Sequence, residues 1–226
     1  MSSKVKRRPI TTTTQRRAAG VPWVWVVIAL AIGALLGGPI GAATADPRSD
    51  TERAVDAIKA ADAKRDAQQI VALTEQARQV RDTLAPILDE LATAVPPAGA
   101  APGPDATPQR VAAWKAVTTK TVEGFANPPS AGTGVNIARS GLTSAVRTLH
   151  EAVIAYEQAL QAPAPAKAAQ LAHAGQLRNI AVATWAVGGT ELDQLNVDAG
   201  NGHAHVFLPA APGQGAMTSD GSPEGK

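Results

Sequence analysis

The sequence predicts an all-α protein in which a single N-terminal transmembrane helix precedes an up-and-down bundle of about four helices. The first bundle helix is long, and the C-terminal tail is disordered. Three observations predict this: 25 uncharged residues at 21–45, later apolar residues that recur three and four apart, and Pro/Gly-rich breaks between those stretches. Each helix has an apolar stripe that it cannot cover alone, which favours a bundle, and no credible β-sheet pattern is visible.

The uncharged segment 21–45 is just long enough to cross a bilayer, because about 20 helical residues span a hydrocarbon core of roughly 30 Å. Trp23 and Trp25 stand at its N-terminal edge, where indole rings prefer the headgroup layer, and Arg16 and Arg17 precede them. The basic tail, residues 1–20, contains no acid, so the positive-inside rule places the N-terminus in the cytoplasm. Everything after residue 45 is then outside.

The same segment has a second interpretation, as a cleaved signal peptide. Its last part contains Pro39 and several glycines, and a small-x-small pattern ends at Ala45. Cleavage there would give a secreted protein, whereas an uncleaved segment gives a single-pass membrane protein; both put the bundle outside the cell membrane. Gly33, Gly37 and Gly41 repeat every four residues, a pattern that allows close packing of membrane helices but is also common in such segments.

The first bundle helix is expected over residues 46–95, capped at Asp46-Pro47 or at Ser49-Asp50. Its first half carries mostly Ala and charged residues, which predicts a solvated stalk, and its second half has a regular apolar pattern from Ile70 onward. Pro86 predicts a kink or a new helical start. Residues 96–106 are rich in Pro, Ala and Gly and predict a linker.

The remaining bundle helices are expected within residues 107–198. The first begins at Thr107-Pro108 and ends before the Asn-Pro-Pro sequence at 127–129; the next runs over 134–161; a last helix over 166–187 stops at Gly188-Gly189 and is followed by a short helical turn. The last two helices are joined by a short proline-containing turn and should form an antiparallel hairpin. Residues 199–226 predict a flexible tail, interrupted by an extended run at 203–208.

Composition and charge exclude several classes of function. The chain has no cysteine, which excludes disulfide scaffolds and thiolate metal or redox sites. Fifteen of the 21 basic residues and all 19 acidic residues follow position 45, so the later part carries about four excess negative charges and is not expected to bind nucleic acid. The basic tail instead suits anionic lipid headgroups.

Candidates for chemistry are few. His150-Glu151 begins like a zinc-protease motif, but position 154 is Ile, so the second histidine is missing. His203 and His205 would share one face of an extended segment and could bind a metal, with Asp198 as a third ligand. The structural alternative, incidental histidines on a glycine-rich tail, is the simpler interpretation.

The other candidates also have simpler structural interpretations. The carboxylate pairs Asp89/Glu90 and Glu191/Asp193 have no nucleophile beside them, and Gly132-Thr133-Gly134 could bind an anion at a helix N-terminus but is better explained by capping and loop flexibility. Four aromatic residues could line a small apolar pocket or simply fill an alanine-rich core, and we favour packing: Trp114, Phe125, Tyr156 and Trp185.

No catalytic or cofactor-binding motif is present, so the sequence predicts a non-enzymatic protein without a cofactor. We expect a membrane-anchored extracytoplasmic helical protein with a structural or protein-interaction role. Its partners would be the lipid bilayer and either another protein or a second copy of the chain, bound through the first helix. The alternative is a secreted or anchored ligand-binding bundle with a small apolar pocket.

Overall fold

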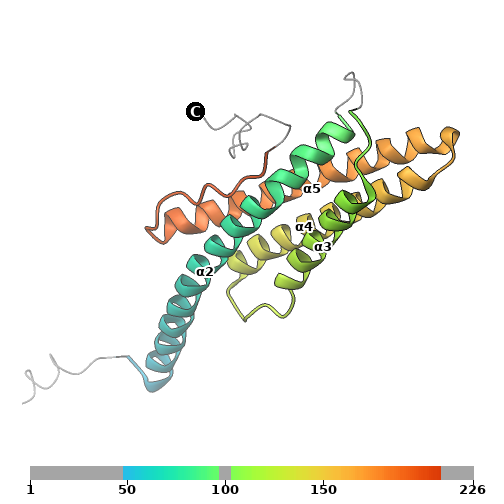
Figure 1. The fold of residues 1–226 in the computed structure, drawn as a ribbon. Helices are drawn as coiled ribbons and strands as arrows, with labels where there is room; N and C mark the ends of the chain where they lie inside the picture. Colours follow the sequence, from blue (N-terminus) through green and yellow to red (C-terminus); the bar gives the residue numbers. More distant parts are fainter. Residues whose placement is uncertain (1–47, 97–102, 210–226) are drawn as a thin grey trace, which may run out of the picture. The chain divides into compact units, whose positions relative to one another are not determined.

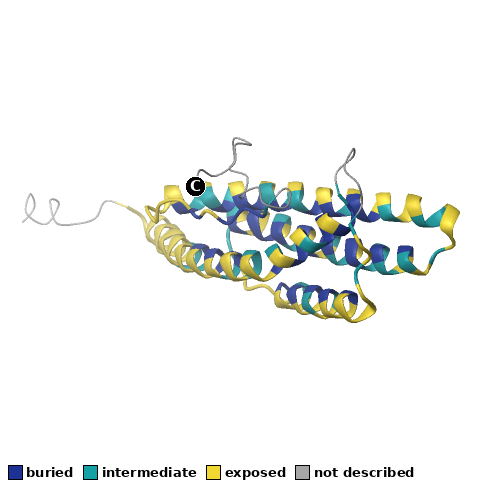
Figure 2. Cartoon of the chain, turned by 45° about the horizontal axis from the view of Figure 1, so that its top comes forward, coloured by how far each residue is buried: buried dark blue, intermediate teal, exposed yellow. Residues whose placement is uncertain are grey.

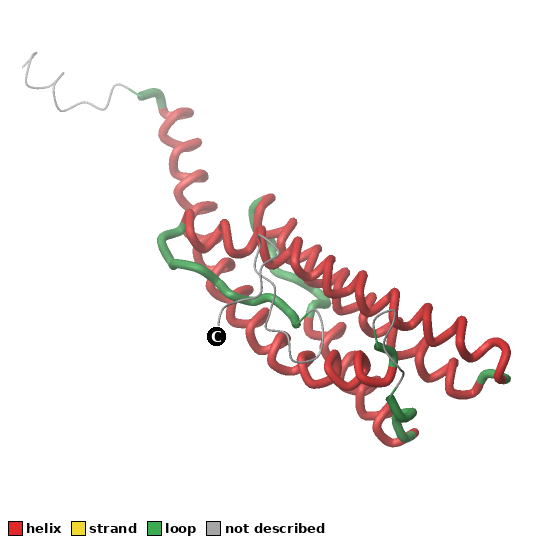
Figure 3. Tube along the Cα trace, turned by 90° about the horizontal axis from the view of Figure 1, so that it is seen from above, coloured by secondary structure: helices red, strands yellow, loops and turns green. Residues whose placement is uncertain are grey.

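Four helices form a bundle in the computed structural model, which describes residues 48–96 and 103–209 (Figure 1). They are α2 (Asp50–Ala94), α3 (Pro108–Gly124), α4 (Thr133–Gln161) and α5 (Ala164–Asp198). The described residues contain no β-strand, as the tube in Figure 3 shows. The predicted all-α bundle is therefore confirmed at this level.

Several predictions concern residues outside the described ranges. These are the uncharged segment at 21–45, the tail beyond residue 209, and the membrane-related residues Arg16, Arg17, Trp23, Trp25, Gly33, Gly37 and Gly41. Among the described helices, none combines the length and the apolar character that crossing a bilayer requires.

The chain divides into two units, residues 1–54 and 55–226, and of the first only residues 48–54 are described. Ser49 caps this helix, the second of the two predicted starts. Its hydroxyl accepts from the Glu52 backbone N–H at 3.2 Å, and the Glu52 carboxylate accepts from the Ser49 backbone N–H at 2.6 Å. The backbone hydrogen bond from Ser49 lowers the pKa of Glu52.

The first half of α2 is exposed on all sides, and its second half belongs to the core. Every residue from Asp50 to Lys64 is exposed, which confirms the predicted solvated half, whereas Ile70, Leu73 and later apolar residues are buried (Figure 2). The helix continues through Pro86 without interruption, so the alternative of a new helical start at this proline is wrong. Leu84, Ile87 and Leu88 beside it are buried in the core, and this packing offsets the backbone hydrogen bond that the proline cannot make.

The second half of α2, α3, α4 and α5 share one hydrophobic core. Thr107 caps α3, as predicted, by accepting from the Arg110 backbone N–H at 3.3 Å, with Pro108 in the first helical position. Trp114 and Tyr156 pack with ring centroids 5.7 Å apart, and the Tyr156 hydroxyl accepts from the Ala106 backbone N–H at 2.9 Å. All four aromatic residues are buried; Tyr156 and Trp185 are fully enclosed, whereas Phe125 and Trp114 each also line a cavity.

Helices α4 and α5 form the predicted hairpin, but the predicted helix stop at Gly188-Gly189 is wrong: α5 continues to Asp198. A Cβ built on Gly188 would lie 2.8 Å from the Ala138 carbonyl oxygen, and one on Gly141 would lie 2.8 Å from the Cα of Gly188. These two glycines therefore lie where the backbones of the two helices come close together. Glycine is retained here because the backbones touch, not because the helix ends.

Residues 199–209 turn back at the end of α5 and run along the bundle beside α5 and α2 (Figure 1, red). The Trp185 Nε1–H donates to the Val206 carbonyl oxygen at 2.5 Å, and Arg81 donates to the His205 carbonyl oxygen at 2.5 Å. Four side chains of the extended run are buried: Ala204, Val206, Phe207 and Leu208. The run predicted to interrupt the tail at 203–208 is therefore packed against the bundle and completes the core, although His205, with φ of 48°, departs from the predicted extended conformation.

Candidate functional site

The outward-facing side of α5 carries a continuous stripe of exposed, uncharged residues. Nine positions spaced alternately four and three apart are all exposed: Ala169, His173, Gln176, Ile180, Ala183, Val187, Thr190, Gln194 and Val197. We call these nine residues the outer stripe. Ile180 is 53% exposed, Val187 67% and Val197 42%, although all three are large apolar residues. Alternating three–four spacing is the pattern by which one helix packs along another.

The outer stripe makes α5 different from α4. The buried residues of α4 lie along one stripe, and the opposite side carries polar residues such as Ser140, Ser144 and Arg147. Helix α5 has its core-facing residues on one side, including Trp185 and Leu192, and the outer stripe on the other. Five residues of the outer stripe are apolar and four are polar, and none is Asp, Glu, Lys or Arg. Large apolar side chains exposed along one helix face are typical of an interaction surface. The outer stripe is therefore the best candidate interaction surface among the described residues.

This surface was missed in the sequence because only one apolar pattern was sought in each helix. Two three–four patterns run through α5, and the inner one begins at Ala174 and includes Ala181 and Trp185. The scarcity of charged residues was a signal in the sequence that could have identified this surface. Between Lys167 and Glu191 the helix contains one charged residue, Arg178, and its side chain is buried.

His203 and His205 lie 5.6 Å apart by ring centroid, but the carboxylate beside them is not the predicted one. His203 Nδ1 lies 2.8 Å from Asp193 Oδ2, and the Ala204 backbone N–H donates to Asp193 Oδ1 at 2.6 Å. Asp198 instead accepts from Gln194. Within residues 48–96 and 103–209, no group of three or more His, Cys, Asp or Glu side chains is arranged to hold a metal ion.

Asp193 connects the end of α5 to the returning segment. Burial by itself would raise the pKa of Asp193, but the hydrogen bonds with His203 and the Ala204 backbone N–H, together with the positive charges of His203 and His205, outweigh it, so the pKa lies below its ordinary value. Through these contacts with His203 and Ala204, the carboxyl group of Asp193 binds the returning segment to the end of α5. Glu191, the other member of the predicted carboxylate pair, instead lies near Gly134 at the start of α4.

The other predicted candidates have local structural partners. His150 is half-buried at the edge of the core, and its Nδ1 lies 2.9 Å from the Thr118 hydroxyl oxygen. Glu90 accepts hydrogen bonds from Arg110 and from the indole N–H of Trp114, the latter at 2.7 Å. Asp89 is exposed on the surface of α2.

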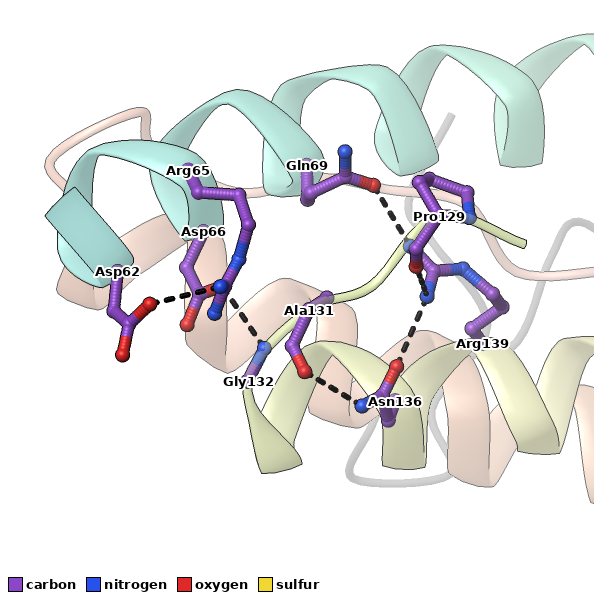
Figure 4. A network of polar contacts seen from close by, with 9 residues as sticks. All are labelled: Asp62, Arg65, Asp66, Gln69, Pro129, Ala131, Gly132, Asn136 and Arg139. Atoms are coloured by element: carbon purple, nitrogen blue, oxygen red, sulfur yellow. Dashed lines mark hydrogen bonds and ion pairs between the residues drawn. The ribbon is translucent and has the colours of Figure 1, made fainter.

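The N-terminus of α4 holds an anionic group of the chain itself. Asp66 of α2 accepts from the Gly132 backbone N–H at 2.9 Å, and Arg65 donates to the same carboxylate (Figure 4). A Cβ on Gly132 would lie 2.1 Å from the Asp66 carboxylate, so a side chain at this position would displace that carboxylate. The Gly132-Thr133-Gly134 sequence thus has a capping role, and the capping group comes from another helix.

Two buried arginines complete the polar interior, and neither was singled out in the sequence. Arg139 is 7% exposed and Arg178 2%. Both occupy core-facing positions, Arg139 four residues after Val135 and Arg178 four after Ala174, so the helical spacing was a signal that could have identified them. Burial lowers the pKa of each guanidinium group.

In comparisons with known proteins, no protein-family model, no curated protein and no solved structure matches this chain.

Proposed function

We propose that this chain is a non-enzymatic, single-pass membrane-anchored extracytoplasmic protein whose bundle pairs with a second copy of itself through the outer stripe of α5. A single transmembrane helix then precedes an up-and-down bundle outside the membrane. The role is structural or one of protein interaction. The observation that carries the proposal is the outer stripe, an exposed and uncharged three–four pattern over 29 residues of one helix.

The membrane part of the proposal is supported by the sequence pattern. Six basic residues and no acid precede the 25 uncharged residues at 21–45, and all acidic residues follow. The exposed residues of α2 before Arg65 suit a solvated connection between this segment and the bundle. Cleavage after Ala45 would give the secreted form of the same protein.

The charges of α5 favour a second copy in antiparallel orientation. Glu191 and Asp198 lie near its C-terminal end, and its first turn contains no acidic residue; Lys167 in that turn is ion-paired with Asp105, Nζ to Oδ2 at 2.5 Å. Parallel pairing would bring the acidic ends of both copies together, whereas antiparallel pairing separates them. Opposed helix dipoles favour the same orientation.

A specific register follows from the spacing. Antiparallel pairing that sets Ile180 opposite Ala183 also sets His173 opposite Thr190 and Gln176 opposite Val187. It pairs eight of the nine positions of the outer stripe with one another around a two-fold axis. Large residues then face small or polar ones, which permits close approach.

Sedimentation velocity of the full chain in detergent tests the pairing. We expect wild type to be dimeric and Val187→Glu, which would bury a carboxylate in each copy, to weaken the dimer at least 100-fold, or about 3 kcal/mol. Val71→Glu is the matched control, because Val71 is 56% exposed on α2 and lies outside the outer stripe. A monomeric wild type, or equal weakening by both substitutions, would contradict the pairing; a complex with a different protein at α5 would replace the second copy as partner.

The N-terminal sequence and mass of the natively expressed protein, fractionated between membrane and medium, test the anchoring. An intact N-terminus in the membrane fraction is expected. A chain that begins at Asp46 in the medium would favour the secreted form, and an intact chain in the cytosol would contradict both.

A further inference from the structure

A cavity of about 220 Å³ lies between α2 and the connection from α3 to α4. It is lined by residues of α2 that include Gln69 and Gln76, by Gly124–Pro129, and by Arg139 of α4. Arg139 is the one charged residue among these lining residues. The wall is otherwise made of amide side chains, backbone groups and apolar groups, so its electrostatic character is set by one guanidinium.

The guanidinium of Arg139 has only neutral partners within the described residues. It donates to the Pro129 carbonyl oxygen at 3.2 Å and to Asn136 Oδ1 at 3.0 Å from Nη1, and to Gln69 Oε1 at 3.0 Å from Nη2 (Figure 4). No carboxylate of the described ranges forms an ion pair with it, and nearby Asp66 is bound to Gly132 and Arg65. The charge is therefore desolvated without a counter-charge, which makes the site attractive to an anion.

Arg178 shows how the chain otherwise accommodates such a group. Its Nη1 donates at 2.6 Å to the carbonyl oxygen of Val95, directly after the last turn of α2, where the partial negative charge of the helix end offsets the cation. Arg178 lines none of the described cavities. Arg139 instead donates to the carbonyl oxygen of Pro129 in a loop, and it lines a cavity. The two buried arginines therefore differ in that only Arg139 has space beside it for a ligand.

The hydrogen bonds also orient the amide of Gln69. Its oxygen accepts from Arg139, which leaves its NH₂ group, with two donors, for another partner. Asn127 adds a second amide to the wall and holds a left-handed backbone, with φ of 53°, a conformation that costs free energy in a residue other than glycine. One cation with amide donors around it suits oxygen acceptors that carry a negative charge.

We propose that this cavity binds a small oxyanion, a carboxylate or a phosphate, with Arg139 as its counter-charge and the amide of Gln69 as a second donor. The volume of about 220 Å³ is below the range in which pockets for drug-sized molecules begin, about 300 Å³, and favours a small ligand. This site is independent of the outer stripe of α5, and its failure would leave the pairing proposal unchanged.

Thermal unfolding of the full chain in detergent tests the proposal, with sodium phosphate and sodium succinate titrated separately against sodium chloride of equal ionic strength. We expect saturable stabilisation by one of the two anions with a millimolar dissociation constant. Phosphate and succinate distinguish the two sources of the oxyanion. Equal unfolding temperatures in all three salts would overturn the site.

The variants separate binding from folding. Arg139→Gln should weaken anion binding at least tenfold, and Arg178→Gln should retain it even if that variant unfolds at lower temperature. If Arg139→Gln does not fold, Gln69→Leu, which keeps the guanidinium, should weaken binding several-fold. Anion stabilisation that persists in Arg139→Gln, or in Gln69→Leu when only that variant folds, would refute the assignment.

Discussion

Replacing Gly188 or Gly189 with alanine should change stability in opposite directions, although the two glycines are neighbours in one helix. The Cβ of Gly188→Ala would meet the Ala138 carbonyl oxygen and the Leu142 nitrogen, each at 2.8 Å. Both contacts are with backbone atoms, which cannot rotate away, so α4 and α5 must separate by about half an ångström. The Cβ of Gly189→Ala would lie 3.4 Å from the Phe207 ring, an ordinary contact.

The magnitudes follow from two opposing contributions. Alanine in place of glycine in a helix interior stabilises by about 1 kcal/mol, and overpacking a close contact costs roughly 1–3 kcal/mol, occasionally more. Gly188→Ala should therefore lose about 1–2 kcal/mol net, because the helix separation also disturbs the adjacent core. Gly189→Ala should be neutral or gain up to about 1 kcal/mol.

Thermal unfolding followed by circular dichroism at 222 nm measures the difference. For a chain of this length, 1 kcal/mol corresponds to about 2–4 °C in Tm. We expect Gly188→Ala to lower Tm by about 2–8 °C while Gly189→Ala leaves it unchanged or raises it. A Gly188→Ala variant as stable as wild type would refute the close crossing of α4 and α5.

Two further predictions concern the returning segment at 203–208. The pKa of Asp193 is lowered in the folded state, so its contribution to the free energy of unfolding is complete above the ordinary carboxyl pKa of about 3.9 and is lost as the pH falls through the folded value. Asp193→Asn should therefore make the free energy of unfolding less dependent on pH below about pH 4. Urea titrations that show the same acid dependence in wild type and variant would contradict this. Trp185→Phe keeps an aromatic ring but removes the N–H that donates to the Val206 carbonyl oxygen, so the free energy of unfolding measured with denaturant should fall by about 1–3 kcal/mol. An unchanged free energy of unfolding would mean that this hydrogen bond does not stabilise the packing of the segment.

The sequence predicted the features that depend on local chemistry. Thr107-Pro108 and Ser49 begin helices because a side-chain oxygen near a first turn satisfies free backbone N–H groups, wherever the helix lies in the fold. The breaks after α3 and α4 follow from prolines in the same way. In α4 the apolar residues of the sequence follow a single stripe, and this stripe is the side that the structure buries.

The features that were predicted wrongly depend on contacts between distant segments. A glycine pair near a helix end is equally compatible with a stop and with close packing, and only the position of Gly141 on α4 decides for packing. The run at 203–208 was itself predicted, but its packing against the bundle was not, because its backbone is bound by the indole of Trp185 and by Arg81 of α2. Such partners cannot be assigned from local pattern alone.

The candidate sites show the same division. The histidine pair suggested a metal site, but the carboxylate beside it comes from Asp193, ten residues before His203 and inside α5. The cavity beside Arg139 forms only where α2 meets the connection from α3 to α4. The outer stripe of α5, by contrast, is visible in the sequence once a second pattern is sought in the same helix.

Cysteine cross-linking on intact cells that express the chain is the most direct test of the central claim, that extracytoplasmic bundles pair through α5 in antiparallel orientation. The chain has no native cysteine, so single substitutions report single positions. Two differently tagged chains, His173→Cys and Thr190→Cys, are co-expressed and treated with a short bismaleimide that does not cross membranes. The account predicts a mixed His173→Cys/Thr190→Cys product that exceeds either homodimer, and a Val71→Cys control that stays monomeric. Predominant homodimers, or no product until the cells are lysed, would contradict it.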